Sequence, residues 1–348
     1  MSPTAGQRIA VDAMGSDLGP AEMVAAVALA LRNFEKLEPI VLVGNENTLQ
    51  PLLAAEGIAG HPKLSIHHAP SVIEMTDKPL QALKRKKDSS MLQAIELVKT
   101  GGATAVVSCG NTGALMAGGT LRLRTLDGIE RPALATVIPN RNGRFILIDA
   151  GANPDARPEH LLHNAILGRN YARVVLGIAN PRIGLLTIGT EEGKGNELIN
   201  DAHDLLKRVG DQLNYQGPIE GFHVFDNAVD VIVCDGFTGN VVLKTSESLF
   251  KMLTGFIRDE MTATPVRKIG ALLSRGAFKA VKTQLNPDEF GGAPLLGLRG
   301  NVFKAHGSSN RNAVMHAIRI AHEMIARDLN DHIVEDAARI AGLLAPTV

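Results

Sequence analysis

Short apolar runs alternate along most of the chain with longer segments in which apolar residues recur at helical spacing. The apolar runs, each expected to form a strand, cover residues 8–12, 40–44, 64–68, 103–108, 183–188, 230–234 and 302–305. The helical segments cover residues 20–31, 89–99, 158–176, 196–208 and about 309–344, and further helices begin at Thr112 and Asn240. This alternation predicts an α/β fold: three layers, α/β/α, around a mainly parallel, Rossmann-like sheet.

Two further apolar runs, residues 133–138 and 144–149, are separated only by the tight-turn sequence PNRNG, which predicts a β-hairpin. No linker rich in Pro, Ser or Gly divides the chain. We therefore expect residues 1–348 to form a single α/β catalytic domain.

Polar loops that contain glycine follow six of the predicted strands. They read DAMGSD, SCGNTG, DAGAN, IGTEEGKGNE, CDGFTGN and KAHGSSN. Ligands of parallel α/β sheets bind beyond the carboxyl ends of the strands, so we expect the six loops to share one edge and one extended site. The candidate residues in these loops, besides those discussed below, are Asp12, Gly15, Asn153, Asn196, Asp235, Thr238, His306 and Ser308.

The stretch VVSCGNTGALM, residues 106–116, passes from a strand into a helix through the turn GNTG. Free backbone N–H groups at a helix N-terminus attract anions, so the N–H groups of Thr112, Gly113 and Ala114 are a candidate phosphate site. A tight turn that binds nothing is the alternative, because short glycine-containing loops of this kind are common. A similar stretch, VIVCDGFTGNVVLK at residues 231–244, favours the anion site.

Nucleotide binding, covalent catalysis and metal binding each have less support in the sequence. GNTGAL lacks dinucleotide-binding spacing, and GTEEGKG lacks the spacing of a P-loop, but Lys194 could still neutralise phosphate or an oxyanion. Cys109 and Cys234 could be nucleophiles with His306 as base, yet each ends a buried strand, which favours a packing role. The acids Asp12, Asp149 and Asp235 are scattered, so no metal is expected.

The composition limits the possible partners and the cellular compartment of the protein. The net charge is zero, so no nucleic-acid partner is expected. Two cysteines are no disulfide framework and indicate a reducing compartment. The first residues lack a signal-peptide pattern, and no apolar run approaches the roughly 18 residues of a spanning helix. These features predict a cytoplasmic protein.

Residues 261–287 differ from the rest of the chain because they contain no acidic residue but five basic ones, Arg267, Lys268, Arg275, Lys279 and Lys282. Apolar residues recur at helical spacing, and a Ser-Arg-Gly break predicts two short helices within a protruding amphipathic hairpin at residues 250–288. The hairpin could cover the core or a subunit interface. It could instead contact a membrane peripherally through its apolar side chains, Val266, Ile269, Leu272, Leu273 and Phe278. The pattern leaves both interpretations open.

The basic run Lys84-Arg85-Lys86-Lys87 directly precedes a helix. Such a run is usually a solvated face, but it could collect an acidic carrier protein or a phosphate.

Taken together, the loops resemble one family. DAMGSD, RKKDSSM, SCGNTGALM, GIERPALATVIP, DAGAN, GTEEGKGNEL, CDGFTGNVVLKTSE and GGAPLLGLRGNVFKAHGSSNRNAVMHAI are similar, in order and approximate spacing, to the bacterial phosphate acyltransferases (acyl-ACP:phosphate transacylases) of phospholipid synthesis. The resemblance covers residues 8 to about 326. It implies a fold related to phosphotransacetylase and, more distantly, to isocitrate-dehydrogenase-type enzymes.

The resemblance also implies an activity: acyl-ACP and inorganic phosphate give acyl phosphate and free acyl carrier protein, with no cofactor. It implies a homodimer associated peripherally with the membrane through the hairpin, where a glycerol-3-phosphate acyltransferase uses the acyl phosphate. Lys194 in GKGNE and Asn240 in GFTGN match the positions expected to be catalytic.

The mechanism expected from these residues is a direct attack of phosphate on the thioester. Phosphate would sit on the GNTG turn, held by Lys194 and oriented by Asn111, while Asn240 would bind the tetrahedral oxyanion. Two other classes stay open. A metal- and NAD-dependent 2-hydroxyacid dehydrogenase would need clustered acids, and a non-catalytic membrane scaffold would not need so many polar glycine loops.

Overall fold

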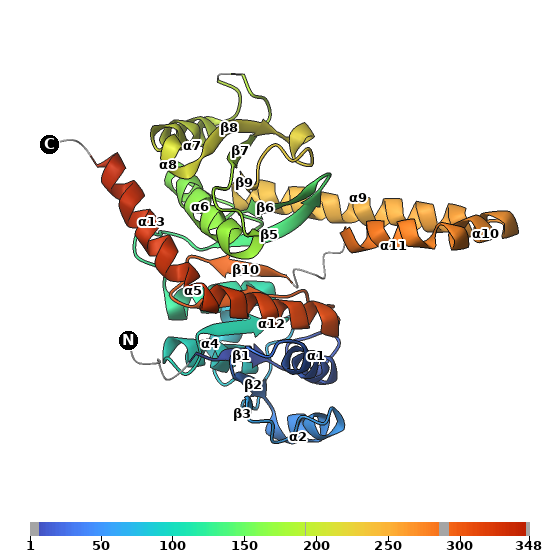
Figure 1. Ribbon diagram of the computed structural model, residues 1–348. Coiled ribbons are helices and arrows are strands. Elements are labelled where there is room, and N and C mark those ends of the chain that lie inside the picture. Colours follow the sequence, from blue (N-terminus) through green and yellow to red (C-terminus); the bar gives the residue numbers. More distant parts are fainter. Residues whose placement is uncertain (1–6, 192, 285–291, 346–348) are drawn as a thin grey trace.

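The computed structural model describes residues 7–191, 193–284 and 292–345. Within them, all strands belong to one eleven-stranded sheet in the order β3-β2-β1-β4-β11-β10-β5-β6-β9-β7-β8 (Figure 1). The strands are β1 Ile9–Asp12, β2 Ile40–Gly44, β3 Leu64–His68, β4 Ala105–Ser108, β5 Ala133–Asn140, β6 Gly143–Ile148, β7 Ile183–Thr187, β8 Tyr215–Glu220, β9 Val231–Val233, β10 Ala293–Leu296 and β11 Asn301–Lys304.

The helices between the strands are α1 Pro20–Asn33, α2 Glu46–Ala55, α3 Pro79–Arg85, α4 Ser90–Lys99, α5 Thr112–Leu123, α6 Pro158–Tyr171, α7 Glu197–Arg208, α8 Gly210–Leu213, α9 Gly236–Thr262, α10 Pro265–Leu273, α11 Arg275–Gln284, α12 Arg311–Ala326 and α13 Leu329–Leu344. A π-helical turn, Ala172–Leu176, extends α6, and a short 3-10 turn spans Gly221–His223.

Alternating residues along each strand enter two different cores. Val11 and Val107 pack with helices α1 and α12 on one face, whereas Ala10 and Val106 pack with α4 and α5 on the other. In the second half of the sheet, α6, α7 and α13 cover the first face. The opening turns of α9, through Val242 and Leu243, pack against the other face. This confirms the three-layer α/β/α architecture.

The sheet reverses direction at its centre. β10 is antiparallel to both β11 and β5, and β5 is antiparallel to β6, while the pairs on either side are parallel. Strands β1, β4 and β11 therefore run opposite to β6, β9 and β7. The predicted hairpin of β5 and β6 is one cause of this reversal.

Most predicted elements are present, with small shifts at their ends. β2 and β3 have the predicted limits, and α9 begins at Gly236, four residues before the predicted Asn240, because Asp235 caps it. β8, β10, α2, α3 and α8 were not predicted. β8 and β10 contain the sequences YQGPIE and APLL, whose proline and glycine are poor strand signals.

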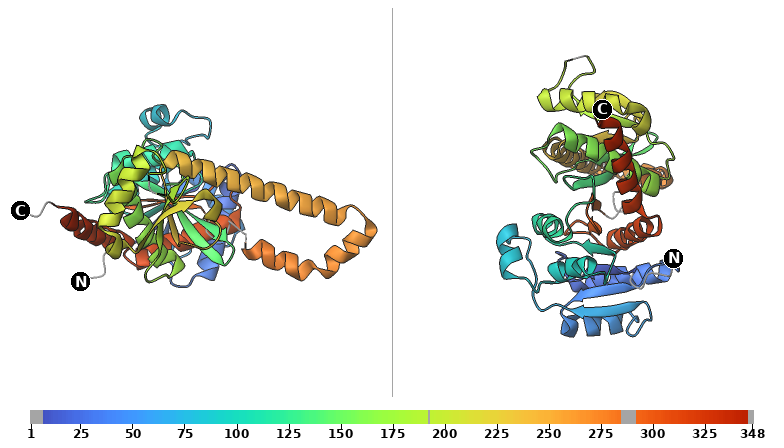
Figure 2. Two further views of the ribbon diagram at one scale, coloured as in Figure 1. Left: turned by 90° about the horizontal axis from the view of Figure 1, so that it is seen from above. Right: turned by 90° about the vertical axis from the view of Figure 1, so that its left-hand side faces the viewer.

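Helices α9, α10 and α11 project from the body of the molecule (Figures 1 and 2). α9 begins against the sheet and continues well beyond it, α10 lies at the far tip, and α11 returns toward the body. The break between α10 and α11 falls at Ser274, in the predicted Ser-Arg-Gly sequence. Residues 285–287 of the acid-free segment lie outside the described residues.

Candidate functional site

The six glycine-containing loops do not share one edge of the sheet, contrary to the prediction. Those after β1, β4 and β11 lie at one end of the strands, and those after β6, β7 and β9 lie at the other. The prediction assumed one direction for all six strands, and the antiparallel strands β10 and β5 between the two groups reverse it.

The first group of loops is tied together around Asp12. This carboxylate is fully buried and accepts a hydrogen bond of 2.7 Å from Ser108 Oγ, which itself accepts one from the N–H of Gly110. Burial raises the pKa of Asp12, and its hydrogen bonds oppose that shift. Gly15 is required here because a Cβ atom would lie 2.7 Å from Asp12 Oδ2. Asp12 and Gly15 therefore hold the loops together.

The third loop of this group is less enclosed. Gly307 accepts hydrogen bonds from the N–H of Asp17 (2.9 Å) and from Ser16 Oγ (3.2 Å), which joins it to the first loop. The exposed His306 pairs through Nδ1 with Ser308 Oγ at 2.8 Å. Those two predicted site residues contact one another and remain open to solvent.

More of the hydrogen-bonding groups of the GNTG turn are paired within the protein than the sequence indicated. Asn111 Oδ1 caps α5 by accepting from the N–H of Ala114 at 3.0 Å. Asn111 Nδ2 donates to the carbonyl oxygens of Glu74, Met75 and Asp77. These groups of Asn111 and Ala114 are thus already paired within the protein, and their roles in phosphate binding stay predictions. The N–H groups of Thr112 and Gly113 remain free to donate.

In the second group of loops, Asp149 lies at the end of β6 and is fully buried. Its carboxylate accepts from four backbone N–H groups, those of Leu134, Gly151, Ala152 and Asn153. Asn153 Nδ2 donates to Asp149 (2.9 Å) and to Pro132, and its carbonyl accepts from Gly236. Asn153 thus fastens the loop after β6 to the start of α9 rather than facing solvent.

Three other predicted site residues hold helix ends. Asp235 caps α9, accepting from the N–H of Thr238 at 2.9 Å and from its hydroxyl at 2.6 Å. Asn196 caps α7, accepting from the N–H of Ile199 at 3.0 Å. Their polar atoms stabilise the elements that carry the site.

The side chains of Asn240 and Lys194 are less enclosed than those of the capping residues. Asn240 lies in the second turn of α9, its side chain is exposed, and it packs beside Gly151, where the missing Cβ leaves room. Lys194 follows β7, the strand next to β9, and its stem lies over Gly189. It forms a 3.0 Å ion pair with Glu191 and remains half exposed. A cationic donor and an amide donor are thus available in the segments that follow two neighbouring strands.

Lys194 and the GNTG turn lie apart within one chain. Their strands, β7 and β4, are six positions apart in the sheet order and run in opposite directions. Six strand spacings amount to about 29 Å. A lysine side chain cannot bridge that separation, so the expected phosphate site shared by Lys194 and GNTG is not formed by a single protomer.

The cysteines are enclosed. Cys109 is fully buried, and burial raises the pKa of its thiol to about 12. Burial also raises the pKa of Cys234 well above its usual value. Neither forms a thiolate near neutral pH, and His306 is outside hydrogen-bonding contact with either thiol in the described structure. The packing explanation for both is favoured.

A buried lysine that the sequence analysis did not single out joins the first group of loops. Lys304, at the end of β11, donates to the carbonyl oxygens of Cys109 and Ala305. Burial lowers the pKa of Lys304, and the nearby positive charge of Lys244 on α9 lowers it further. The sequence feature that could have identified this residue is the presence of a lysine inside the apolar run 302–305. The influence of Lys244 on this pKa indicates that α9 passes within electrostatic range of the first group.

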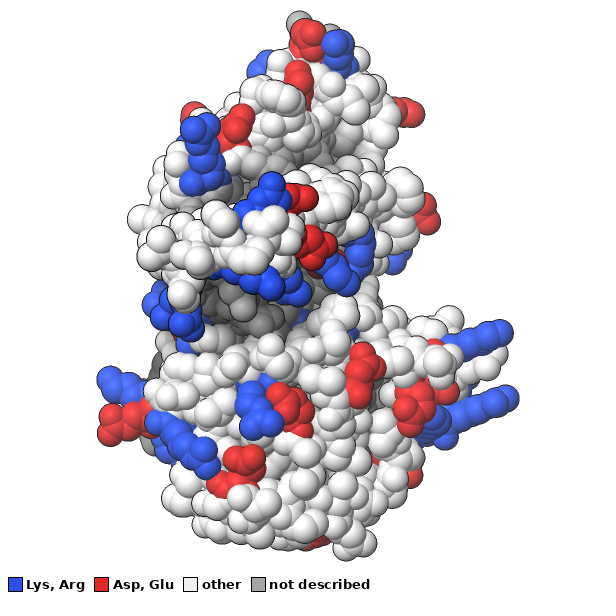
Figure 3. Space-filling model, turned by 90° about the vertical axis from the view of Figure 1, so that its right-hand side faces the viewer, with Lys and Arg blue, Asp and Glu red and all other residues white. Residues whose placement is uncertain are grey.

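The basic run lies beside the GNTG turn. Pro79, the first residue of α3, would be 2.7 Å from a Cβ atom on Gly113. Lys86 is committed to Asp77 at 2.6 Å, whereas the other three basic residues of the run are exposed. Figure 3 shows several Lys and Arg side chains on the side of the molecule from which α9 projects.

The projecting helices carry apolar side chains in solvent. In α10 no residue is buried, and Val266, Leu272 and Leu273 are 79%, 68% and 83% exposed. Ile269 and Phe278 are also exposed. In the part of the chain that the structure describes, no helix is long and apolar enough to span a bilayer. The same residues contain no cluster of three or more His, Cys, Asp or Glu that could hold a metal.

Comparison with known proteins identifies relatives over almost the whole chain. The family model described as "Fatty acid synthesis protein" matches residues 7–332. A phosphate acyltransferase of Desulfitobacterium hafniense is 46% identical over 334 residues, which cover 95% of this chain and 98% of that protein. One from Geobacter sulfurreducens is 44% identical, covering 94% and 93% of the two chains.

Among solved structures, a phosphotransacetylase from Streptococcus pyogenes has a TM-score of 0.60 at 17% identity, covering 92% of this chain and 94% of that one. A branched-chain phosphotransacylase from Enterococcus faecalis has a TM-score of 0.54 at 16% identity, covering 92% and 99%. These likenesses confirm the predicted relation of the fold to phosphotransacetylase. The sequence relatives go further: this chain belongs to the phosphate acyltransferase family of enzymes.

Proposed function

We propose that the enzyme transfers the acyl group of acyl-ACP to inorganic phosphate, forming acyl phosphate and free carrier protein for phospholipid synthesis. The observation that carries the proposal is that Lys194 lies in the loop after β7 and Asn240 in the opening turns of the helix after β9, the adjacent strand, and that both residues are exposed. The names of the sequence relatives support acyl transfer to phosphate.

Lys194 binds the phosphate in this proposal. Phosphate is anionic at neutral pH, so it needs a cation and little base assistance to act as a nucleophile. The ion pair with Glu191 holds the ammonium group over Gly189 until phosphate replaces it. Proximity to the thioester carbonyl then supplies most of the advantage.

Asn240 stabilises the tetrahedral intermediate. A phosphate oxygen attacks the carbonyl carbon, the C–O bond forms, and the carbonyl oxygen becomes an oxyanion to which the amide of Asn240 donates. The carbonyl re-forms as the C–S bond breaks, and the phosphopantetheine thiol of the carrier leaves as a thiolate. No cofactor enters this scheme.

The exposed basic side chains of Lys84, Arg85 and Lys87 form the docking surface for the acidic carrier. They belong to α3 and its C-terminal end, which pack against α5 beside the GNTG turn. Reversing these three charges should raise KM for acyl-ACP at least about tenfold at low salt and leave KM for phosphate unchanged. Reversal of Lys207, an exposed lysine at the end of α7, is the matched control.

The enzyme acts as a homodimer whose subunits meet along α9. Beyond the body of the molecule α9 exposes apolar side chains at helical spacing: Leu249, Phe250, Leu253, Phe256 and Ile257. Such a stripe is stabilised by covering it. Sedimentation should show a dimer for the wild type and a monomer for Leu253→Glu with Phe256→Glu; a dimer in the variant would reject this interface.

The tip of the projection, α10, contacts the membrane peripherally, and the soluble body stays in the cytoplasm. Apolar residues of α10 enter the acyl boundary, while Arg267 and Lys268 meet anionic headgroups. This position delivers acyl phosphate to a glycerol-3-phosphate acyltransferase in the membrane.

The direct test is to incubate the protein with acyl-ACP and phosphate, trap acyl phosphate as the hydroxamate with hydroxylamine, and measure the free carrier. We expect equal amounts of the two products, dependent on phosphate. Release of free carrier without hydroxamate would indicate a thioesterase, and no release at all would reject acyl transfer.

A further inference from the structure

Large apolar side chains lie in solvent just beyond the ends of three neighbouring strands. β9, β7 and β8 are parallel and follow one another in the sheet. Ile188 directly follows β7, Phe222 lies two residues beyond β8, and Phe237 lies four residues beyond β9. Their exposed fractions are 82%, 84% and 67%. We call these three residues the apolar row.

The register of the strands brings the apolar row together. Thr187, the last residue of β7, pairs with Glu220, the last residue of β8. Leu185 of β7 pairs with Val233, the last residue of β9. Neighbouring strands lie about 4.8 Å apart, so the three strand ends span roughly 10 Å. The three apolar residues therefore follow one short stretch of the sheet edge.

Such exposure is unusual on the body of this molecule. Apart from the apolar row and the residues of α9 to α11, only Leu80 and Leu121 among the described large apolar residues are exposed to a similar extent, 64% and 68%. Single exposed apolar residues need no explanation, but several on one stretch of surface mark a binding site. The apolar row is therefore a candidate binding surface.

The apolar row lies next to the two residues proposed to act on the substrate. Lys194 belongs to the loop that begins with Ile188. Asn240 follows Phe237 by three residues on α9, and side chains at that spacing are neighbours on a helix surface. A thioester carbonyl bound at Asn240 carries its alkyl chain directly on the reacting carbon. That chain must be covered by apolar groups nearby if it is to leave water.

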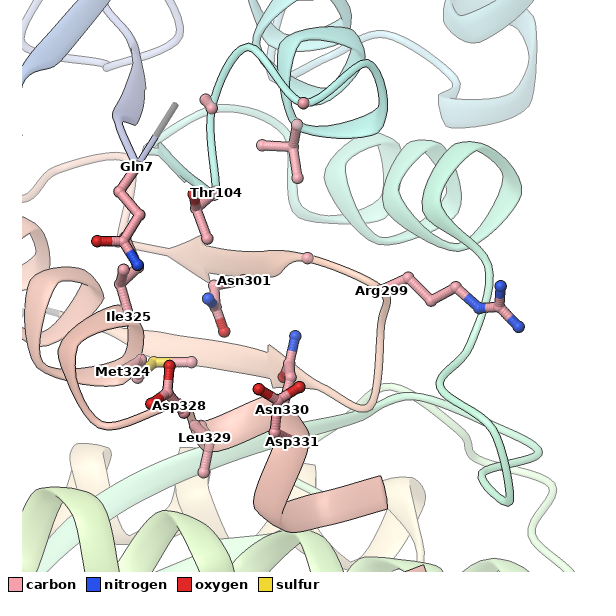
Figure 4. A pocket seen from close by; sticks show the side chains of 14 residues that line it. Gln7, Thr104, Arg299, Asn301, Met324, Ile325, Asp328, Leu329, Asn330 and Asp331 are labelled. Atoms are coloured by element: carbon pink, nitrogen blue, oxygen red, sulfur yellow. The ribbon is translucent and has the colours of Figure 1, made fainter. Parts of the chain in front are cut away.

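The cavity of about 430 Å³ shown in Figure 4 does not provide this cover. It lies between Gln7, the start of β11 and the turn between α12 and α13, at the amino ends of β4 and β11. None of its lining residues belongs to the loops after β6, β7 or β9. An alkyl chain that starts at Asn240 therefore meets the apolar row and not this cavity.

Two other occupants fit the apolar row less well. A stable protein interface takes roughly 20–30 residues from each side, and the apolar row has three. An anionic membrane surface attracts unpaired basic residues, whereas the flanking side chains of Lys194 and His223 are each paired with a carboxylate. A narrow, uncharged alkyl chain needs neither a wide contact nor a net charge.

We propose that the apolar row binds the alkyl chain of the acyl group and sets the preference for its length. The chain runs from Phe237, beside Asn240, across Ile188 to Phe222, so that only longer chains reach the last residue. This inference rests on the proposed function, because it takes the thioester carbonyl to lie at Asn240.

Kinetics with acyl-ACP substrates of different chain length test the proposal. Butyryl-, octanoyl- and palmitoyl-ACP present the same carrier and the same thioester, so they differ only in apolar length. For the wild type, we expect kcat/KM for acyl-phosphate formation to rise about fourfold for each methylene that the apolar row covers, and then to level off.

Phe222→Ser removes the far end of the apolar row. It should lower kcat/KM for palmitoyl-ACP at least about tenfold and leave the value for butyryl-ACP within about twofold of the wild type. Ile188→Ser should lower kcat/KM for octanoyl-ACP as well. Leu121→Ser changes an equally exposed residue on α5 and is the matched control, which should keep the wild-type profile.

All three side chains are exposed, so the variants should fold, which circular dichroism checks. A ratio of kcat/KM between palmitoyl- and butyryl-ACP that is the same in Phe222→Ser, Ile188→Ser and the wild type would overturn the role of the apolar row and leave acyl transfer intact. A wild type that forms no acyl phosphate from any of the three substrates would reject the proposed function, and the apolar row as an acyl site with it.

Discussion

At the scale of single residues, the structure separates polar side chains that hold the backbone from those that face solvent. Asn111, Asn153 and Asp235 follow strands in glycine-containing loops, as a ligand-binding residue would. The side-chain oxygens of Asn111 and Asp235 cap helices, however, and the side-chain amide of Asn153 donates to Asp149 and to the carbonyl of Pro132. Asn240 has the same sequence context and keeps an exposed amide. Three of these four residues are asparagines in similar loop sequences, so the sequence alone does not separate them, and the neighbouring backbone decides the role.

The GNTG turn can be tested by removing one donor. Thr112→Pro deletes the N–H of the first residue of α5, where proline fits a helix, and Asn111 has the extended conformation (φ −54°, ψ 117°) that proline requires before it. Because the turn lies far from Lys194, we expect KM for phosphate to stay within about twofold, whereas loss of a charge-assisted hydrogen bond costs about tenfold or more. Steady-state kinetics at varied phosphate checks this, and a tenfold rise would restore the turn as the phosphate site.

The cysteines should be chemically silent in the native state. With a pKa of about 12 for Cys109, roughly one thiol in ten thousand is ionised at pH 8. Iodoacetamide should therefore label the native protein at least about a hundredfold more slowly than the protein in denaturant. Combined replacement of Cys109 and Cys234 by Ala should leave acyl transfer within about threefold of the wild type. A folded but inactive variant would argue for covalent catalysis.

At the scale of elements, α9 to α11 show what periodicity alone can establish. The acid-free composition and the spacing of apolar residues predicted amphipathic helices with a break at Ser274, and these are present. The hairpin expected at residues 250–288 begins within α9, but periodicity did not determine the point at which α9 leaves the sheet, because its sequence is equally compatible with a helix lying on the sheet. Only tertiary contacts determine where a long helix leaves the core.

The tip of this projection gives a prediction about membranes. Ile269→Glu with Leu273→Glu places two charges where apolar side chains would enter the acyl boundary, so binding to anionic vesicles should fall at least about tenfold in a sedimentation assay. Phe222→Glu alters an equally exposed apolar residue on the body and should bind normally. Unchanged binding by the tip variant would leave α10 with a purely structural role.

The attachment of α13 predicts a pH dependence of stability. Burial by itself would raise the pKa of Asp336, but hydrogen bonds from Arg339 and Asn170 and the charge of Arg169 lower it below 3.8. A carboxyl group whose pKa is lower in the folded protein stabilises the folded state at pH values above its unfolded pKa. This stabilisation is lost as the pH falls through the pKa of the folded state. Asp336→Asn should therefore reduce the free energy of unfolding by about 1–3 kcal/mol at pH 7.

The difference between this variant and the wild type should shrink below about pH 3.8, which denaturant titrations at several pH values would measure. A difference that stays constant across the acid range would mean that the charge of Asp336 contributes nothing.

At the scale of the whole molecule, the sequence predicted the layers and most strands but not the reversal of the sheet. Alternating strands and helices, with Val11 and Val107 on one face and Ala10 and Val106 on the other, required two covered faces. The reversal depends on β10, whose four residues, APLL, carry no alternation and pair with β5 and β11 from distant parts of the chain. One unpredicted strand thus divided a single expected site into two groups of loops.

The central claim is that Lys194 and Asn240, in the segments that follow the neighbouring strands β7 and β9, act on one transition state. The most direct measurement is the rate of acyl-phosphate formation by Lys194→Ala, Asn240→Ala and the double variant. Asn45→Ala, which removes a helix cap at α2, serves as the control and should keep full activity while losing about 1 kcal/mol of stability.

We predict a loss of about a hundredfold or more for each single variant and, because the two side chains act as a unit, little further loss in the double variant. Single variants that retain activity within about threefold of the wild type, or losses that simply multiply, would contradict the joint site.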